Sequence, residues 1–120
     1  MELITVINAR KVLDSFADKE DMCTHLSYWM TKFIAKTEGE QEFYANEMRK
    51  LFEKYADKQE NDTIRIPTER VGEFNKAVEA LNRTHVEDPG IKFSLSELST
   101  ELKISMKQMY PLLDFIEEDK

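Results

Sequence analysis

The chain has 120 residues, of which 41% are hydrophobic and 34% are charged, with only three glycines and three prolines. This length suits one hydrophobic core, and this composition favours helix. No apolar run approaches the roughly 20 residues that span a bilayer, and no signal-peptide pattern opens the chain, so we expect a soluble, non-secreted protein. The formal net charge of −7 disfavours direct DNA binding, because phosphate contacts need a positive face.

The segment from Glu20 to Asp57 is the most informative part of the sequence. A first helix is predicted before it, over residues 4–17, and a polar break at 18–21 separates the two. The apolar residues of the long segment recur in steps of four and three, which places them on one stripe of an amphipathic helix. They are Met22, Leu26, Trp29 and Phe33, followed by Tyr44, Met48, Leu51 and Tyr55.

This stripe lapses between Phe33 and Tyr44, where Gly39 interrupts the helix pattern. Glycine in a helix interior costs about 1 kcal/mol relative to alanine. Either one long helix bends at Gly39 or two helices meet there. We favour the bent single helix, because the stripe resumes in phase at Tyr44 and the Glu-rich surroundings contain no good turn.

A short strand and a helix are predicted after the long helix. Residues 59–62 are typical of a turn, and residues 63–66 alternate like a strand that Pro67 ends. Pro67 also suits the first turn of a helix, which we expect to continue through Leu81.

The remaining residues predict a hairpin and two short helices. Residues 84–94 favour two strands around an Asp-Pro-Gly turn, and residues 63–66 could supply a third strand. One short helix begins at Ser94 or Ser96 and a last one near Ser105. We therefore predict an α+β fold, mostly α, with long N-terminal helices, a small two- or three-stranded antiparallel sheet and short C-terminal helices. Residues 1–120 form a single domain, with a helical part over 1–58 and a small sheet with helices over 59–120.

Three patterns in the sequence carry candidate chemistry, and each has a simpler structural interpretation. Residues 95–113 resemble a helix-turn-helix. However, Pro111 would interrupt the second helix, which contacts the DNA bases in such motifs, and acidic residues outnumber basic ones in the C-terminal segment. Asp21, Cys23 and His25 are zinc-ligand types, yet no second ligand cluster accompanies them. Cys23 also lacks an evident base that would make it a nucleophile. We therefore predict a protein that is not an enzyme and that has no cofactor and no metal.

Aromatic and apolar residues extend beyond the main stripe of the long helix. A helix that is apolar on more than one side either lies deep in the fold or leaves a face for a partner. In a chain this small we expect a face left over, with self-association as its simplest use. The predicted partner-binding residues are Tyr28, Trp29, Met30, Phe33 and Phe43.

The order of several short segments resembles that of a group of small phage and prophage proteins. These segments are Leu51-Phe-Glu-Lys-Tyr-Ala56, Ile64-Arg-Ile-Pro67, Glu73-Phe-Asn-Lys76, Leu95-Ser-Glu-Leu98 and Leu113-Asp-Phe-Ile-Glu-Glu118. The resemblance implies a viral origin and location in the host cytoplasm, with or without association with the virion. It carries no catalytic residues.

Three functions follow as hypotheses. The first is a phage protein that binds protein, either as a minor virion or assembly component or as a self-associating accessory protein. The second is an acidic inhibitor of a host nucleic-acid enzyme or defence complex. The third is a helix-turn-helix-like DNA-binding regulator. We favour the first, with protein as the partner, nucleic acid disfavoured and no membrane contact.

Overall fold

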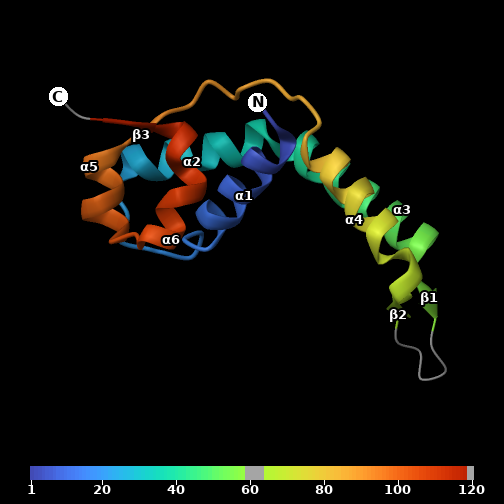
Figure 1. Cartoon of the computed structure of the whole chain (residues 1–120). Coiled ribbons are helices and arrows are strands. Elements are labelled where there is room, and N and C mark those ends of the chain that lie inside the picture. The colour runs from blue at the N-terminus through green and yellow to red at the C-terminus, as the bar shows by residue number, and fades with distance from the viewer. Residues whose placement is uncertain (59–63, 119–120) are drawn as a thin grey trace.

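The computed structural model describes residues 1–58 and 64–118 and is mostly helical (Figure 1). The predicted turn at residues 59–62 and the first residue of the predicted strand, Thr63, lie outside the described residues. The elements in chain order are α1 (Leu3–Asp14), α2 (Thr24–Lys36), α3 (Glu38–Tyr55), β1 (Asp57–Lys58), β2 (Ile64–Arg65), α4 (Thr68–Asn82), β3 (Phe93–Ser94), α5 (Leu95–Glu97), the π-helix η1 (Leu98–Leu102), α6 (Met106–Met109), the 3₁₀ helix η2 (Tyr110–Phe115) and β4 (Ile116–Glu117).

The molecule consists of a helical body and a long projecting arm (Figure 1). The body contains α1, α2 and the C-terminal elements from β3 to β4. The arm, as we call it throughout, is the pair of helices α3 and α4, which run side by side. The strands β1 and β2 pair at the far end of the arm. The Cα radius of gyration is 17.4 Å, whereas a compact chain of this length has about 13.6 Å. The arm is responsible for this elongation.

Three phenylalanine rings form the centre of the body core. The ring of Phe33, in α2, lies 4.9 Å from the ring of Phe115 and 5.9 Å from the ring of Phe93. All three are buried, and aliphatic residues from α1, α2 and the C-terminal elements surround them. Burial of such large apolar side chains provides most of the stability of a domain this size. These aliphatic residues include Val6, Leu13, Leu26, Met30, Leu98, Leu102 and Leu112.

A smaller cluster joins α1 to the end of the arm nearest the body. Leu3 and Ile7 of α1 are buried against Leu81 of α4, and Met48 of α3 packs against them. Backbone hydrogen bonds also join the start of the chain to the segment that follows α4. As a result, α1 covers only the proximal part of the arm.

The long helix predicted over residues 20–57 is two helices that meet at Thr37, so the single bent helix was wrong. Gly39 lies inside the first turn of α3 and is not the point of change. The buried Thr37 hydroxyl donates to the Phe33 carbonyl oxygen at 2.7 Å. A threonine that bonds back to the preceding turn in this way tends to bend a helix.

The predicted antiparallel sheet over residues 84–94 was also wrong. Residues 84–92 form an extended connection without a hairpin, and β3 pairs instead with β4, in parallel, with Phe93 opposite Ile116. The two residues of β1 pair antiparallel with β2 at the far end of the arm, away from β3. Burial explains why β3 pairs with β4 and not within a hairpin. Because Phe93 is buried in the body core, β3 lies beside the C-terminal strand.

The C-terminal elements turn sharply at Lys103, which has a left-handed backbone with φ of 48°. Ser105 then begins α6 with a capping box, in which its hydroxyl accepts from the Gln108 N–H. Left-handed backbone disfavours any residue with a Cβ.

Lys103→Gly is therefore expected to raise the free energy of unfolding by about 0.5–1 kcal/mol. Urea denaturation measures this change. Lys107→Gly is the control, because Lys107 lies in α6 and glycine should destabilise that helix. A destabilising Lys103→Gly would contradict the role given to this turn.

Candidate protein-binding surface

The structure separates the five residues that the sequence predicts for partner binding. Met30 and Phe33 are buried in the body core and are not part of any surface. Tyr28 and Trp29 are exposed on α2, with ring centroids 5.2 Å apart in an edge-to-face arrangement. Phe43 is exposed on α3, beyond the change of direction at Thr37. These residues therefore do not form one continuous surface.

The arm has little interior of its own. All residues of α3 are described, and none of them is buried, although this helix has 18 residues. In α4 only Leu81, at the proximal end, is buried. Two helices alone cannot enclose an apolar stripe from both sides, so a helix pair of this kind leaves apolar surface in contact with water.

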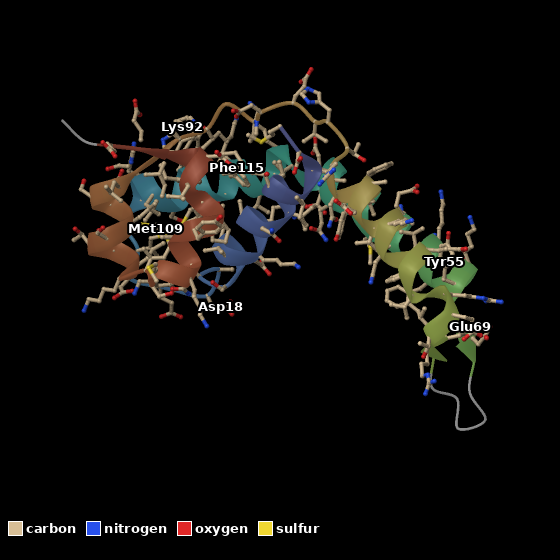
Figure 2. All side chains as sticks on the ribbon, viewed as in Figure 1. Asp18, Tyr55, Glu69, Lys92, Met109 and Phe115 are labelled. Carbon is tan, nitrogen blue, oxygen red and sulfur yellow. The ribbon has the colours of Figure 1, made fainter. Side chains whose placement is uncertain are left out.

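Aromatic residues gather at the distal part of the arm. The ring of Phe74, in α4, lies 5.2 Å from the ring of Phe52 and 6.1 Å from the ring of Tyr55, both in α3. Figure 2 shows Tyr55 and Glu69 far out on the arm, well away from Phe115 in the body. Phe52 is 44% exposed, and Val71 is exposed as well. This cluster holds α3 and α4 together while still presenting apolar surface.

The exposed side of this cluster continues the face that α1 covers nearer the body. Met48 and Phe52 are four residues apart on α3 and therefore neighbours on one helix face. Val71 and Asn75 are likewise neighbours on α4. At about 100° per residue, the antiparallel arrangement puts Phe52, Val71 and Asn75 on the same side of the arm. We call this exposed side the distal face, defined by Phe52, Val71 and Asn75, with the half-buried Tyr55 and Phe74 packed between the two helices beside them.

Phe43 lies on the other side of the arm. Counted at about 100° per residue, Phe43 and Phe52 fall on opposite edges of the α3 face that packs against α4. Their exposed fractions are nearly equal, at 45% and 44%. The two phenylalanines are therefore a matched pair for comparing the two sides of the arm.

A second apolar surface occurs on the body. Met106 and Tyr110 are 87% and 77% exposed, and Leu113 is exposed in the next turn. Tyr110 and Leu113 also line a cavity of about 360 Å³ with Ile4 of α1. This surface comes from α6 and the 3₁₀ helix η2.

The Cys23 and His25 pair has a structural role at the start of α2. The Cys23 thiol donates to Glu97 at 3.4 Å, and the His25 Nδ1 lies 2.8 Å from the same carboxylate. Glu101 accepts from the Cys23 N–H at 3.2 Å. Carboxylates close to a helix N-terminus are favourable because of the helix dipole. The pair of glutamates thus docks η1 and α5 onto α2.

The same arrangement makes Cys23 a poor nucleophile. A hydrogen bond from the Leu26 backbone lowers the pKa of the thiol, but desolvation and the hydrogen bond to Glu97 outweigh it and raise that pKa above its ordinary value. Less thiolate is then present near neutral pH.

Alkylation of Cys23 by iodoacetamide is expected to reach its half-maximal rate at a higher pH than alkylation of an unstructured cysteine peptide. Glu97→Gln should lower this midpoint, because it removes the negative charge beside the thiol. A pH series of alkylation rates measures both, with Glu53→Gln on the arm as the control. A midpoint equal to that of the peptide would contradict this assignment.

The zinc-ligand and helix-turn-helix patterns can be compared with the part of the chain that the structure describes. Asp21 pairs with Lys19 at 2.9 Å and not with His25. Within residues 1–58 and 64–118, no group of three or more His, Cys, Asp or Glu side chains is placed to hold a metal ion. In the helix-turn-helix-like region, α6 keeps α-helical geometry over only four residues before the 3₁₀ helix that contains Pro111.

Comparison with protein-family models, with curated proteins and with solved structures finds no match to this chain. Among the helices of the described residues, none combines the length and the apolar character needed to cross a bilayer.

Proposed function

We propose that this chain is a non-enzymatic protein-interaction protein that binds other protein through the distal face of its arm. The observation that supports it most is the 18-residue helix α3, which carries an aromatic stripe yet contains no buried residue within its described length. Burial of apolar area is worth about 25 cal/mol per Å², so an uncovered aromatic face favours association.

The rest of the surface supports the same class of protein. Tyr28, Trp29, Met106 and Tyr110 give the body further exposed rings and a methionine, which are residue types enriched at protein interfaces. The resemblance to small phage and prophage proteins adds that the partner belongs to a virion, an assembly intermediate or a host machine. The alternatives of a DNA-binding regulator and an acidic inhibitor have less support. α6 is too short to read a groove, and the arm carries charges of both signs.

Photo-cross-linking inside cells tests this proposal. p-Benzoylphenylalanine replaces Phe52 in one variant and Phe43 in the other, so that an aromatic ring is kept at each position. Illumination should give discrete protein adducts from position 52 and far weaker ones from position 43. No adduct from position 52 would reject the distal face as a binding surface, as would stronger adducts from position 43.

A further inference from the structure

We infer that the distal face binds the distal face of a second copy of this chain, with the two arms antiparallel and α3 and α4 of each contributing to a four-helix bundle. This inference rests on the proposed function and names the partner of the same surface. Four observations support it: the burial pattern along the arm, the spacing of the exposed residues, the total exposed surface and the distribution of charge.

The burial pattern shows what kind of element this face accepts. Nearer the body, the helix α1 lies on the arm and buries Leu3 and Ile7 against it. Farther out, Phe52 and Val71 are exposed, and among the described residues α1 does not reach them. Because the two parts belong to one continuous side of the arm, the distal part suits another helix packed in the same manner.

The spacing of residues along the arm matches that of a bundle. Each helix of a four-helix bundle needs two adjacent stripes, one for its hairpin partner and one for the opposite pair. Both helices have a second stripe in steps of four, three and four, and neither stripe contains a charged residue. These stripes are Gln41, Ala45, Met48 and Phe52 in α3, and Val71, Asn75, Val78 and Asn82 in α4. Because α1 packs against Met48 in their proximal part, the distal residues Phe52, Val71 and Asn75 are the ones left for a second copy.

The exposed surface of one chain is large enough for a dimer. Its accessible area is 8368 Å², compared with about 6,700 Å² for a compact monomer of 14.1 kDa. The excess of about 1,600 Å² is roughly twice the 800 Å² that each partner contributes to a standard interface. The excess belongs to the whole elongated chain, and the exposed side chains of Phe52 and Val71 on the distal face contribute to it.

The charge distribution favours a second copy in the antiparallel orientation. Residues 49–75 carry six basic and six acidic side chains, so the whole net charge of −7 lies outside this segment. Two distal arms therefore meet without net repulsion. The net charge lies in the proximal part of α3, where Glu38, Glu40, Glu42 and Glu47 have no basic residue among them, and in the bodies. Antiparallel arms place these acidic parts of the two copies at opposite ends of the pair, farther apart than the screening length of about 8 Å. Parallel arms would bring the bodies together.

Two asparagines provide a matched pair of variants for the test. Asn75 lies on the distal face of α4, and Asn46 lies on the outer side of α3, at about 100° per residue. Both are exposed, so Asn→Glu changes the charge by the same amount at each without removing a buried contact.

Sedimentation equilibrium of the purified chain measures the association. The wild type should sediment at twice the 14.1 kDa mass of one chain at micromolar concentration. Asn75→Glu should raise the dissociation constant at least about 100-fold, because it places two unpaired charges in an apolar interface. Asn46→Glu should leave it within about twofold. Equal effects of the two substitutions would overturn the inference.

Disulfide trapping tests the orientation. In a Cys23→Ser background, Asn75→Cys should form a covalent dimer rapidly, because antiparallel packing of the two distal faces brings α4 against α4 of the other copy. Asn46→Cys should not. Parallel arms would place α4 against α3, and Asn75→Cys would then fail to cross-link while the chain still sedimented as a dimer, which overturns the antiparallel arrangement.

The two proposals can fail separately. If the purified chain stays monomeric at high concentration while position 52 cross-links to a different protein in cells, the second copy is the wrong partner and the binding surface stands. If position 52 gives no adduct at all, both proposals fall.

Discussion

Phe33→Ala is expected to lower the free energy of unfolding by about 3–5 kcal/mol, which is a large part of the total stability of a small domain. The Phe33 ring is buried between those of Phe93 and Phe115, so its removal leaves a cavity and also ends two ring contacts. Guanidinium denaturation at one fixed protein concentration measures the loss.

Phe43→Ala is the matched control for this prediction. Phe43 is exposed on the arm, so the same substitution should change the free energy of unfolding by less than about 1 kcal/mol. Both residues were predicted from sequence to bind a partner. Equal losses from the two substitutions would mean that Phe33 is not the core residue described here.

Arg10→Ala is expected to destabilise the fold by about 2–3 kcal/mol. The Arg10 guanidinium donates from Nη1 to the Ile34 carbonyl oxygen and to the Thr37 hydroxyl, at 2.7 Å each. It also lies 3.2 Å from Glu38, at the first residue of α3. These contacts join α1 to the point where α2 ends and α3 begins, so their loss should also loosen the arm relative to the body.

Thermal and urea denaturation measure the effect of Arg10→Ala, and Lys11→Ala is its control. Lys11 follows Arg10 on α1 but is exposed, so its removal should change stability by no more than about 0.5 kcal/mol. Arg10→Lys should recover only part of the loss, because an ammonium cannot reproduce the forked contacts of a guanidinium. A neutral Arg10→Ala would contradict the role of this residue at the junction.

Local sequence patterns predicted the helices well. The steps of four and three in α2 and α3 follow from the need to place apolar residues on one face, and those faces pack as expected at Leu26, Phe33 and Met48. The same reasoning found the helix through Leu81 and the two C-terminal helices. These features depend on residues close in sequence, so one sequence is enough to reveal them.

The features that were missed depend on contacts between distant residues. The end of α2 is set by Thr37 together with Arg10, which is 27 positions away, and no local pattern reports that pairing. The parallel pairing of Phe93 with Ile116 likewise follows from how the core is filled. The Asp-Pro-Gly turn signal near Gly90 was real, since the Gly90 N–H bonds to Asp88, but no hairpin follows it.

The surface proposed for binding differs from the one that the sequence predicts. The sequence shows a surplus of apolar residues on the long helix, yet it cannot tell which of them α1 and the C-terminal elements cover. Phe33 and Met30 are covered, whereas Phe52 and Val71 are not. The second stripe of Ala45, Met48 and Phe52 was the signal in the sequence that could have located the distal face.

Hydrogen–deuterium exchange of the purified chain at low and high concentration tests the central claim most directly. If a second copy covers the distal face, amides of α3 and α4 around Phe52 and Asn75 should become more protected as concentration rises, while those of α2 stay constant. Asn75→Glu should abolish the change. The account would be contradicted if the amides of the distal arm were already as protected as those of the body core in dilute solution and their protection did not change with concentration.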